Sequence, residues 1–224
     1  DLKNIVTQLS LMLKNAERLQ HNPEFQADML MTVENSLERM KQLMMQLREG
    51  AAPFITDNAD GDRLAPWKTA CDTLGVPYET GGHGDGVFES ADLIVPSPGV
   101  PAALPPLEAA RRRGVPVAGE LELASRFCAA PMLAVTGTNG KTTVTELLRS
   151  MVESCGKSAA LAGNNDTPLS EAVLPPETPD WVVVEVSSYQ METADRFHPR
   201  VAAVLNVTPD HLKRHGTLEV YAAM

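Results

Sequence analysis

Residues 137–143 combine the residue types that bind phosphate groups: Gly137, Thr138, Asn139, Gly140, Lys141, Thr142 and Thr143. Glycines let backbone N–H groups approach an anion closely, a lysine ammonium can reach terminal phosphates, and a threonine hydroxyl can ligate Mg²⁺. The usual spacing of such a loop places a further glycine five residues before Gly140, where this sequence has Val135, so the motif is a variant. We predict that residues 137–143 bind a nucleotide.

An acidic residue, Glu185, stands at the end of the apolar run 181–186. The run is typical of a strand buried on both faces. Ligands of open α/β sheets bind at the carboxyl ends of the strands, so an acid at this point is a candidate for magnesium binding and catalysis. The alternative is that Glu185 is simply a polar residue that ends a strand.

A second group of polar side chains, Asn206, Thr208, Asp210 and His211, follows the apolar run 201–208. A carboxylate and an imidazole near a phosphate loop are candidates for binding Mg²⁺, directly or through water. A histidine in such a loop is more typically a hydrogen-bonded loop residue. In company with Glu185 and residues 137–143, we interpret His211 as a metal ligand.

The elements that must position these residues alternate between strand and helix. Residues 132–136 precede the loop as a strand, and residues 142–155 follow it as a helix. Further strands are expected in the second half at 158–163, 181–186 and 201–208, and in the first half at 53–57, 76–80, 91–95 and 115–119, with helices at 63–75 and 106–114. Continuous apolar strands separated by helices predict an α/β fold with a parallel sheet covered on both faces.

The first 50 residues differ in composition from the rest, with one proline of the 17 in the chain and six of its ten methionines. Apolar residues recur at steps of three and four on both sides of Pro23, which predicts two helices with narrow apolar stripes. Such stripes are buried when a hairpin pairs into a four-helix bundle. We predict that residues 1–50 form a helical hairpin that makes the chain a homodimer.

The overall composition excludes several classes of protein. A net charge of -10 argues against nucleic-acid binding, which needs a basic surface. No apolar run approaches 18 residues, so neither a membrane span nor a signal peptide is expected. The three cysteines are widely separated, which is typical of a protein from a reducing compartment. We expect a cytoplasmic location.

Three segments, 137–148, 185–192 and 206–224, in this order and spacing, resemble the central domain of the Mur ligases, which build the peptide stem of peptidoglycan. Segments 90–101 and 119–127 resemble the first, UDP-binding domain of the same family. The segment Ser-Ser-Tyr-Gln-Met at 187–191 is most similar to the corresponding segment of the family members that join D-glutamate to UDP-N-acetylmuramoyl-L-alanine. The resemblance implies an ATP-dependent carboxylate–amine ligase of peptidoglycan precursor synthesis that works through an acyl phosphate.

The resemblance also implies roles for individual residues. Residues 137–143 would hold ATP, with Lys141, Glu185 and His211 as the catalytic set. Mg²⁺ would be bound by Thr142, Glu185 and His211. The UDP-linked substrate would be contacted by Ser97, Pro98, Gly99, Asn164 and Ser187. By the same resemblance, residues 53–130 are a truncated Rossmann-like UDP-binding domain and residues 131–224 a P-loop-type ATP-binding domain.

The sequence also departs from the family pattern. Asn165 and Asp166 replace an apolar residue and a glycine, and Lys213 stands where the family has an aspartate. The first βα unit of the UDP domain, the lysine expected directly after Met224 and the whole third domain are not in this sequence. We therefore expect the chain to bind nucleotide without turning over.

Residues 1–50 carry a resemblance of their own, to the dimerisation and phosphoacceptor hairpin of sensor histidine kinases. It rests on the opening Asp-Leu-Lys-Asn and the apolar stripes; the histidine that precedes this box in the kinases is not in the sequence. An alternative function follows: a kinase-type dimerisation module joined to a nucleotide-binding α/β domain without catalysis. Another Mur or folylpolyglutamate-type ligase is a third interpretation.

Overall fold

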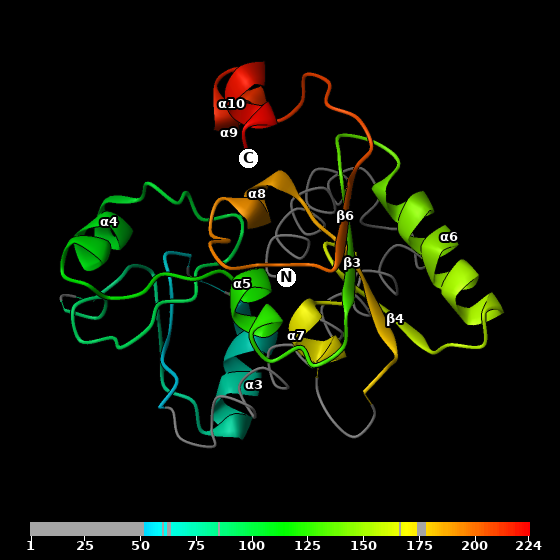
Figure 1. Ribbon diagram of the computed structural model, residues 1–224. Helices are drawn as coiled ribbons and strands as arrows, with labels where there is room; N and C mark the ends of the chain where they lie inside the picture. The colour runs from blue at the N-terminus through cyan, green and yellow to red at the C-terminus, as the bar shows by residue number, and fades with distance from the viewer. Residues whose placement is uncertain (1–51, 60, 62–63, 85, 166, 174–177) are drawn as a thin grey trace, which may run out of the picture. The chain divides into compact units, whose positions relative to one another are not determined.

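The computed structural model describes residues 52–224 except 60, 62–63, 85, 166 and 174–177 (Figure 1). The helical hairpin and the homodimer contact expected for residues 1–50 lie outside the described residues. Within the described part, no helix is both long and apolar enough to cross a membrane. The fold is α/β with parallel sheets throughout, as the sequence predicts.

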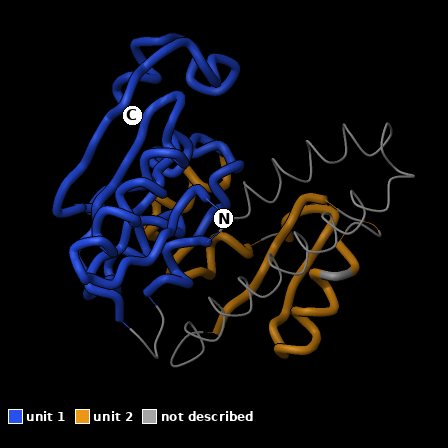
Figure 2. Tube along the Cα trace, turned by 90° about the vertical axis from the view of Figure 1, so that its right-hand side faces the viewer, with its two compact units in different colours: residues 1, 95–104, 117–224 blue, residues 2–94, 105–116 orange. Residues whose placement is uncertain are grey.

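The chain divides into two compact units, drawn in different colours in Figure 2. One unit contains residues 95–104 and 117–224, and the other contains residues 105–116 with the described residues up to Ile94. Segments 95–104 and 117–130 therefore belong to the same unit as the phosphate loop. The functional boundary near residue 130 stays a prediction.

The sheet of the larger unit has four parallel strands in the order β4-β5-β3-β6. The strands span Ala159–Gly163 (β4), Trp181–Glu185 (β5), Met132–Thr136 (β3) and Val201–Val204 (β6). In the register, Val135 of β3 lies opposite Glu185 of β5, and Thr136 lies opposite Val204 of β6. The carboxyl ends of β3, β5 and β6 thus lie at one edge of the sheet. The three predicted polar groups, which are residues 137–143, Glu185 and the segment 206–211, come at these strand ends.

Helices cover both faces of this sheet (Figure 1). The longest, α6 (Lys141–Ser154), packs against β4 and β5 on one face. The opposite face is covered by α5 (Glu120–Ser125) and α7 (Leu169–Ala172), which also contact each other. Three short helices follow β5 and β6: α8 (Ser188–Met191), α9 (Leu212–His215) and α10 (Leu218–Ala222).

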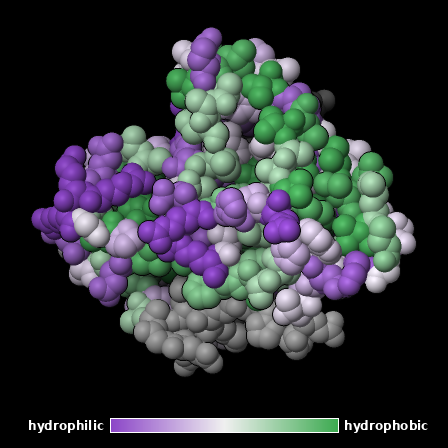
Figure 3. All heavy atoms as spheres, viewed as in Figure 1, coloured by the Kyte–Doolittle hydropathy of each residue, from purple (hydrophilic) through white to green (hydrophobic). Residues whose placement is uncertain are grey.

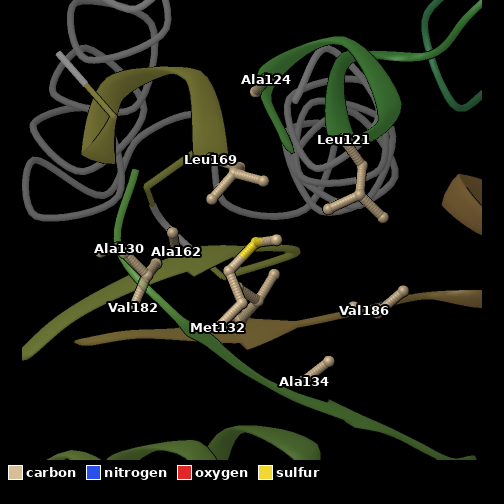
Figure 4. Packing of buried hydrophobic residues seen from close by; sticks show 10 residues of the cluster. Leu121, Ala124, Ala130, Met132, Ala134, Ala162, Leu169, Val182 and Val186 are labelled. Atoms are coloured by element: carbon tan, nitrogen blue, oxygen red, sulfur yellow. The ribbon is translucent and has the colours of Figure 1, made fainter. Parts of the chain in front are cut away.

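The hydrophobic core of the larger unit lies between the sheet and the helices α5 and α7 (Figure 4). Alternate residues of β5, Val182 and Val184, face this layer, whereas the intervening Val183 is equally buried on the other side. Both faces of the strand therefore need apolar side chains, which explains the unbroken apolar run in the sequence. The cluster comprises Leu121, Ala124, Ala130, Met132, Ala134, Ala162, Leu169, Val182, Val184 and Val186.

One side of the larger unit stays apolar at its surface. Val201 and Val204 of β6, the last strand in the described sheet, are exposed, as are Leu147 and Met151 of α6. Figure 3 shows hydrophobic side chains gathered over these two elements.

The smaller unit is a short parallel pair, β1 (Ile55–Asp57) and β2 (Tyr78–Thr80), with α3 (Ala65–Leu74) and α4 (Pro105–Arg112). Two expected strands are wrong: in 91–95 and 115–119, only Ile94 and Val117 form isolated bridges. Prolines within and beside these segments explain the difference, because proline lacks the N–H that continues a ladder.

Candidate active site

The loop at residues 137–140 joins the end of β3 directly to the start of α6. Gly137 has φ 141°, and a Cβ there would meet the backbone oxygen and nitrogen of Asn206 at 3.0 and 3.1 Å. Gly140 is the N-cap of α6, with φ 87° in the left-handed region. Both positions therefore require glycine, one for space and conformation and the other for conformation.

The N-terminus of α6 offers backbone donors for an anion. Its N-cap is a glycine, so no side chain caps the first-turn N–H groups. Such groups, with the helix dipole of a 14-residue helix behind them, attract phosphate. The strand–loop–helix arrangement predicted from the sequence is confirmed.

The side chain of Lys141 folds over its own loop. Its Nζ donates to the carbonyl oxygens of Gly137 at 2.9 Å and Thr138 at 3.1 Å. These bonds hold a positive charge over the loop without neutralising it, because both acceptors are uncharged. The ammonium is thus placed beside the N–H groups of α6, where it adds to their attraction for an anion.

Glu185 is the point where three of the predicted residues meet. Its carboxylate is buried at the end of β5. One oxygen, Oε2, accepts from the Thr142 hydroxyl at 2.8 Å, and the other, Oε1, accepts from the Asn164 amide at 2.9 Å. The backbone N–H of Asn164 also donates to the carbonyl of Glu185 at 2.7 Å. The first turn of α6, the residue after β4 and the last residue of β5 therefore meet at one point. Thr142 and Glu185 were expected to act together on Mg²⁺, whereas Asn164 was expected to contact the substrate.

The donors at this point fit a magnesium ion. A carboxylate and a hydroxyl supply the hard oxygen ligands that Mg²⁺ prefers. Among the described residues, no group of three or more His, Cys, Asp and Glu side chains converges. Mg²⁺ commonly takes one or two protein ligands and fills its remaining positions with phosphate oxygens and water.

His211 lies in a different loop, at the start of α9. Its backbone has φ 52°, the only positive value among the described non-glycine residues. Its Nε2 is 3.6 Å from the Asp210 carboxylate, and its ring lies edge-on to that of Tyr189, with centroids 4.9 Å apart. Imidazole is a poorer ligand for Mg²⁺ than carboxylate, so a metal role for His211 stays a prediction.

Ser187 forms a capping box at the start of α8. Its Oγ accepts from the N–H of Gln190 at 3.4 Å, and the Gln190 Oε1 accepts from the Ser187 N–H at 2.9 Å. This explains the spacing of the two residues in the sequence. The Nε2 of Gln190 is buried without a hydrogen-bond partner. A substrate contact by Ser187 stays a prediction.

Ser97, Pro98 and Gly99 lie in a tight turn closed by a bond from the Val100 N–H to the Ser97 carbonyl at 2.9 Å. The guanidinium of Arg214 donates to the carbonyls of Gly99 at 3.2 Å and Val100 at 2.8 Å. The turn is thus fastened to α9. Its proposed contact with the UDP-linked substrate stays a prediction.

Sequence reasoning missed several residues around the site. Arg214 forms an ion pair with Glu192. The Nε2 of His215 and the Oγ of Ser188 share a hydrogen bond of 3.0 Å, and the hydroxyls of Tyr221 and Thr138 lie 3.1 Å apart. Three residues depart from the family pattern: Lys213 is exposed, Asn165 accepts from the Thr167 N–H at 3.2 Å, and Asp166 lies outside the described residues.

Comparisons with known proteins show what this chain is similar to. Residues 135–224 match the Mur ligase middle domain. The UDP-N-acetylmuramoylalanine--D-glutamate ligase of Koribacter versatilis is 50% identical over 175 residues, which are 78% of this chain and 39% of that ligase. The ligase of the same name from Desulfosudis oleivorans is 48% identical over 175 residues, 78% of this chain and 38% of that ligase. The chain thus spans about two fifths of the length of these relatives.

A solved structure shares the fold. The UDP-N-acetylmuramate:L-alanyl-gamma-D-glutamyl-meso-diaminopimelate ligase from Neisseria meningitides superposes with a TM-score of 0.51 and 21% sequence identity. The match covers 82% of this chain and 62% of that one.

Proposed function

Since this chain belongs to the Mur ligase family through its residues 135–224, we propose that it takes part in joining D-glutamate to UDP-N-acetylmuramoyl-L-alanine with ATP and Mg²⁺. The observation that carries the proposal is the meeting of Thr142, Asn164 and Glu185 beside the phosphate loop. The relatives named above support the choice of amino acid and acceptor. Such a reaction belongs to peptidoglycan precursor synthesis, and we propose that it takes place in the cytoplasm.

ATP is proposed to lie with its phosphates on residues 137–143. The first-turn N–H groups of α6 and the Lys141 ammonium offset the phosphate charge. Lys141 must exchange its bonds with two loop carbonyls for bonds to phosphate oxygens. Because the ammonium starts beside the loop, that exchange needs only a rotation of its flexible side chain.

Mg²⁺ is proposed to be held by Thr142 and Glu185, with His211 as a further ligand, direct or through water. When bound, the ion would neutralise charge on the phosphates. Asn164 holds one oxygen of Glu185 by its amide, so the other oxygen and the Thr142 hydroxyl stay oriented toward each other. The chain thus fixes the direction of its oxygen donors before any ligand arrives.

The proposed reaction has two steps. The alanyl carboxylate forms a bond to the γ-phosphorus of ATP, and the bond to ADP breaks. The amine of D-glutamate then attacks the acyl phosphate, loses a proton and expels phosphate as the amide forms. Both steps bring anions together, so the work of the site is positioning and charge neutralisation. We propose that Asn164, Ser187 and the turn at 97–99 orient the UDP-linked substrate, with residues 53–130 as its UDP-binding domain and 131–224 as the ATP-binding domain.

Nucleotide binding is tested on the 224-residue chain by titration calorimetry with Mg-ADP and a non-hydrolysable Mg-ATP analogue. Saturable one-site binding is expected, and no binding of either would contradict the proposal. The reaction is tested by phosphate release with the longest form of the protein that its gene encodes, because this chain spans about two fifths of its relatives. Release should require UDP-N-acetylmuramoyl-L-alanine, D-glutamate and Mg-ATP together. Nucleotide binding without ligation would favour the interaction module. Ligation of an amino acid other than D-glutamate would indicate another ligase.

A further inference from the structure

We propose that Asn206 is a positioning residue that holds the first half of the phosphate loop and thereby directs the anion to the N-terminus of α6. The inference rests on the proposed binding of nucleotide to residues 137–143. It adds a residue outside the loop, 67 positions away in sequence from Asn139.

The carboxamide of Asn206 pairs with both backbone groups of Asn139. Its Oδ1 accepts from the Asn139 N–H at 2.9 Å, and its Nδ2 donates to the Asn139 carbonyl at 2.9 Å. The backbone of Asn206 takes part as well, since its carbonyl accepts from the Thr138 N–H at 3.0 Å. One residue thus makes three hydrogen bonds to two consecutive residues of the loop.

These bonds continue the pairing of β3 with β6 beyond the ends of both strands. The strands are parallel as far as Thr136 opposite Val204, and the N–H of Leu205 donates to the Thr136 carbonyl at 2.9 Å. Beyond this bond, the Thr208 N–H donates to the Thr138 hydroxyl oxygen at 3.0 Å. The first half of the loop is therefore fixed to the chain that follows β6, and a Cβ at Gly137 would strike it.

The clamp decides which N–H groups face an anion. Those of Thr138 and Asn139 point to Asn206, so neither is directed at phosphate. The donors that remain begin at the N-cap Gly140 and continue into the first turn of α6, where no side chain caps them. A loop already held in its binding conformation loses less conformational freedom when it binds.

Asparagine suits this position because a carboxamide carries a donor and an acceptor side by side. Aspartate at 206 would set a second acceptor against the Asn139 carbonyl and place negative charge beside the phosphate site. Alanine would remove both side-chain bonds and leave the bond to Thr138 in place. The two substitutions therefore separate loss of the clamp from added repulsion.

The test uses the 224-residue chain with Asn206→Asp and Asn206→Ala. The control is Asn58→Asp, an equal change of charge at an exposed asparagine of the other unit. In calorimetric titrations with Mg-ADP at pH 7.5, Asn206→Asp should weaken binding at least tenfold and Asn206→Ala about threefold or more. Asn58→Asp should stay within twofold of the unmodified chain. Binding by Asn206→Asp within twofold would overturn the proposal.

Amide hydrogen exchange measured by NMR without ligand reads the clamp directly. In Asn206→Ala the Asn139 amide should exchange at least tenfold faster, whereas amides in the middle of α6 should keep their rates, which also shows that the variant is folded. Unchanged exchange at Asn139 would overturn the clamp. If the Asn139 amide exchanges faster in Asn206→Ala as expected but the unmodified chain does not bind Mg-ADP, the clamp stands and the proposed nucleotide function is rejected.

Discussion

Arg214 and Glu192 form a two-pronged ion pair, with Nε to Oε1 at 2.9 Å and Nη2 to Oε2 at 2.6 Å. Their side chains are only 16% and 10% exposed. The guanidinium lies 5.2 Å from the centre of the Tyr189 ring, and its remaining donors reach the carbonyls of Gly99 and Val100. One arginine therefore holds α8, α9 and the 97–100 turn together.

Replacing Arg214 with alanine should destabilise the larger unit by about 3–5 kcal/mol, because the Glu192 carboxylate would stay buried without its partner. Urea unfolding followed by circular dichroism measures the loss. Arg196→Ala is the matched control, since its pair with Asp195 is 78% and 89% exposed and should contribute less than about 1 kcal/mol. Equal effects of the two substitutions would show that the Arg214 pair contributes no more than a surface pair.

Lys141→Ala should weaken the binding of Mg-ADP by about 2–3 kcal/mol, the scale of a hydrogen bond to a charged group. Calorimetry on the 224-residue chain measures the change. Lys157→Ala removes a lysine whose exposed ion pair with Asp180 at 3.3 Å lies at the start of β4, and it should leave affinity unchanged. If Lys141→Ala binds as tightly as this control, the ammonium has no part in holding phosphate.

Glu185→Gln should abolish the dependence of nucleotide binding on magnesium. Glutamine keeps an oxygen for the Asn164 amide, and the Thr142 hydroxyl can turn to accept from the new amide group, so the fold should persist. The negative charge that attracts the cation is lost. We expect Mg²⁺ to strengthen ADP binding at least tenfold in the unmodified chain and less than twofold in the variant. Calorimetric titrations with ADP in Mg²⁺ and in EDTA measure this effect. An undiminished magnesium effect in Glu185→Gln would exclude this carboxylate as a ligand.

A buried carboxylate, Glu122, gives stability that depends on pH. Burial by itself raises the pKa of Glu122, but hydrogen bonds from the Arg126 side chain and from backbone N–H groups outweigh it, so the pKa lies below its ordinary value of 4.5. One carboxylate oxygen accepts from the N–H groups of Asp195, Arg196 and Phe197 at 2.8–2.9 Å. These donors favour the charged form.

The sign of the pH effect follows from the lowered pKa. Glu122 is ionised in both the folded and unfolded chain above about pH 5, where its full contribution is present. As pH falls below 4.5, the unfolded chain takes up the proton first, and the contribution is lost as pH passes the folded pKa. Glu122→Gln should cost about 1.5–3 kcal/mol at pH 7. The difference from the unmodified chain should shrink below pH 4.5 in urea unfolding, and a difference that does not vary with pH would contradict this assignment.

The meeting of Glu185 with the phosphate loop was predictable from the sequence, because the carboxyl ends of parallel strands share one edge of a sheet. The apolar runs around Val135 and Val183 identified those strands, since both faces of the sheet are covered. Segments with prolines did not follow the same rule: 91–95 and 115–119 are apolar, yet each contributes only one bridge residue.

The clamp of Asn206 on Asn139 and the pair of Arg214 with Glu192 were not predictable from local patterns. Each bond joins residues 67 or 22 positions apart, and it forms only because the fold brings two loops to the same edge. The sequence shows asparagines, an arginine and a glutamate in polar loops. Nothing in their immediate neighbours distinguishes a partner across the fold from solvent.

The left-handed backbone at residue 211 lowers the stability of the protein when the residue is histidine, whereas the proposed chemistry needs the imidazole. A side chain at φ 52° costs about 1–2 kcal/mol that glycine would not pay, and asparagine would bear part of that strain by bonding locally. Laboratory evolution for heat resistance would therefore favour His211→Gly or His211→Asn, whereas selection for ligation would restore the imidazole. Position 211 should then be a place where thermal tolerance and catalytic rate trade against each other in a library of variants.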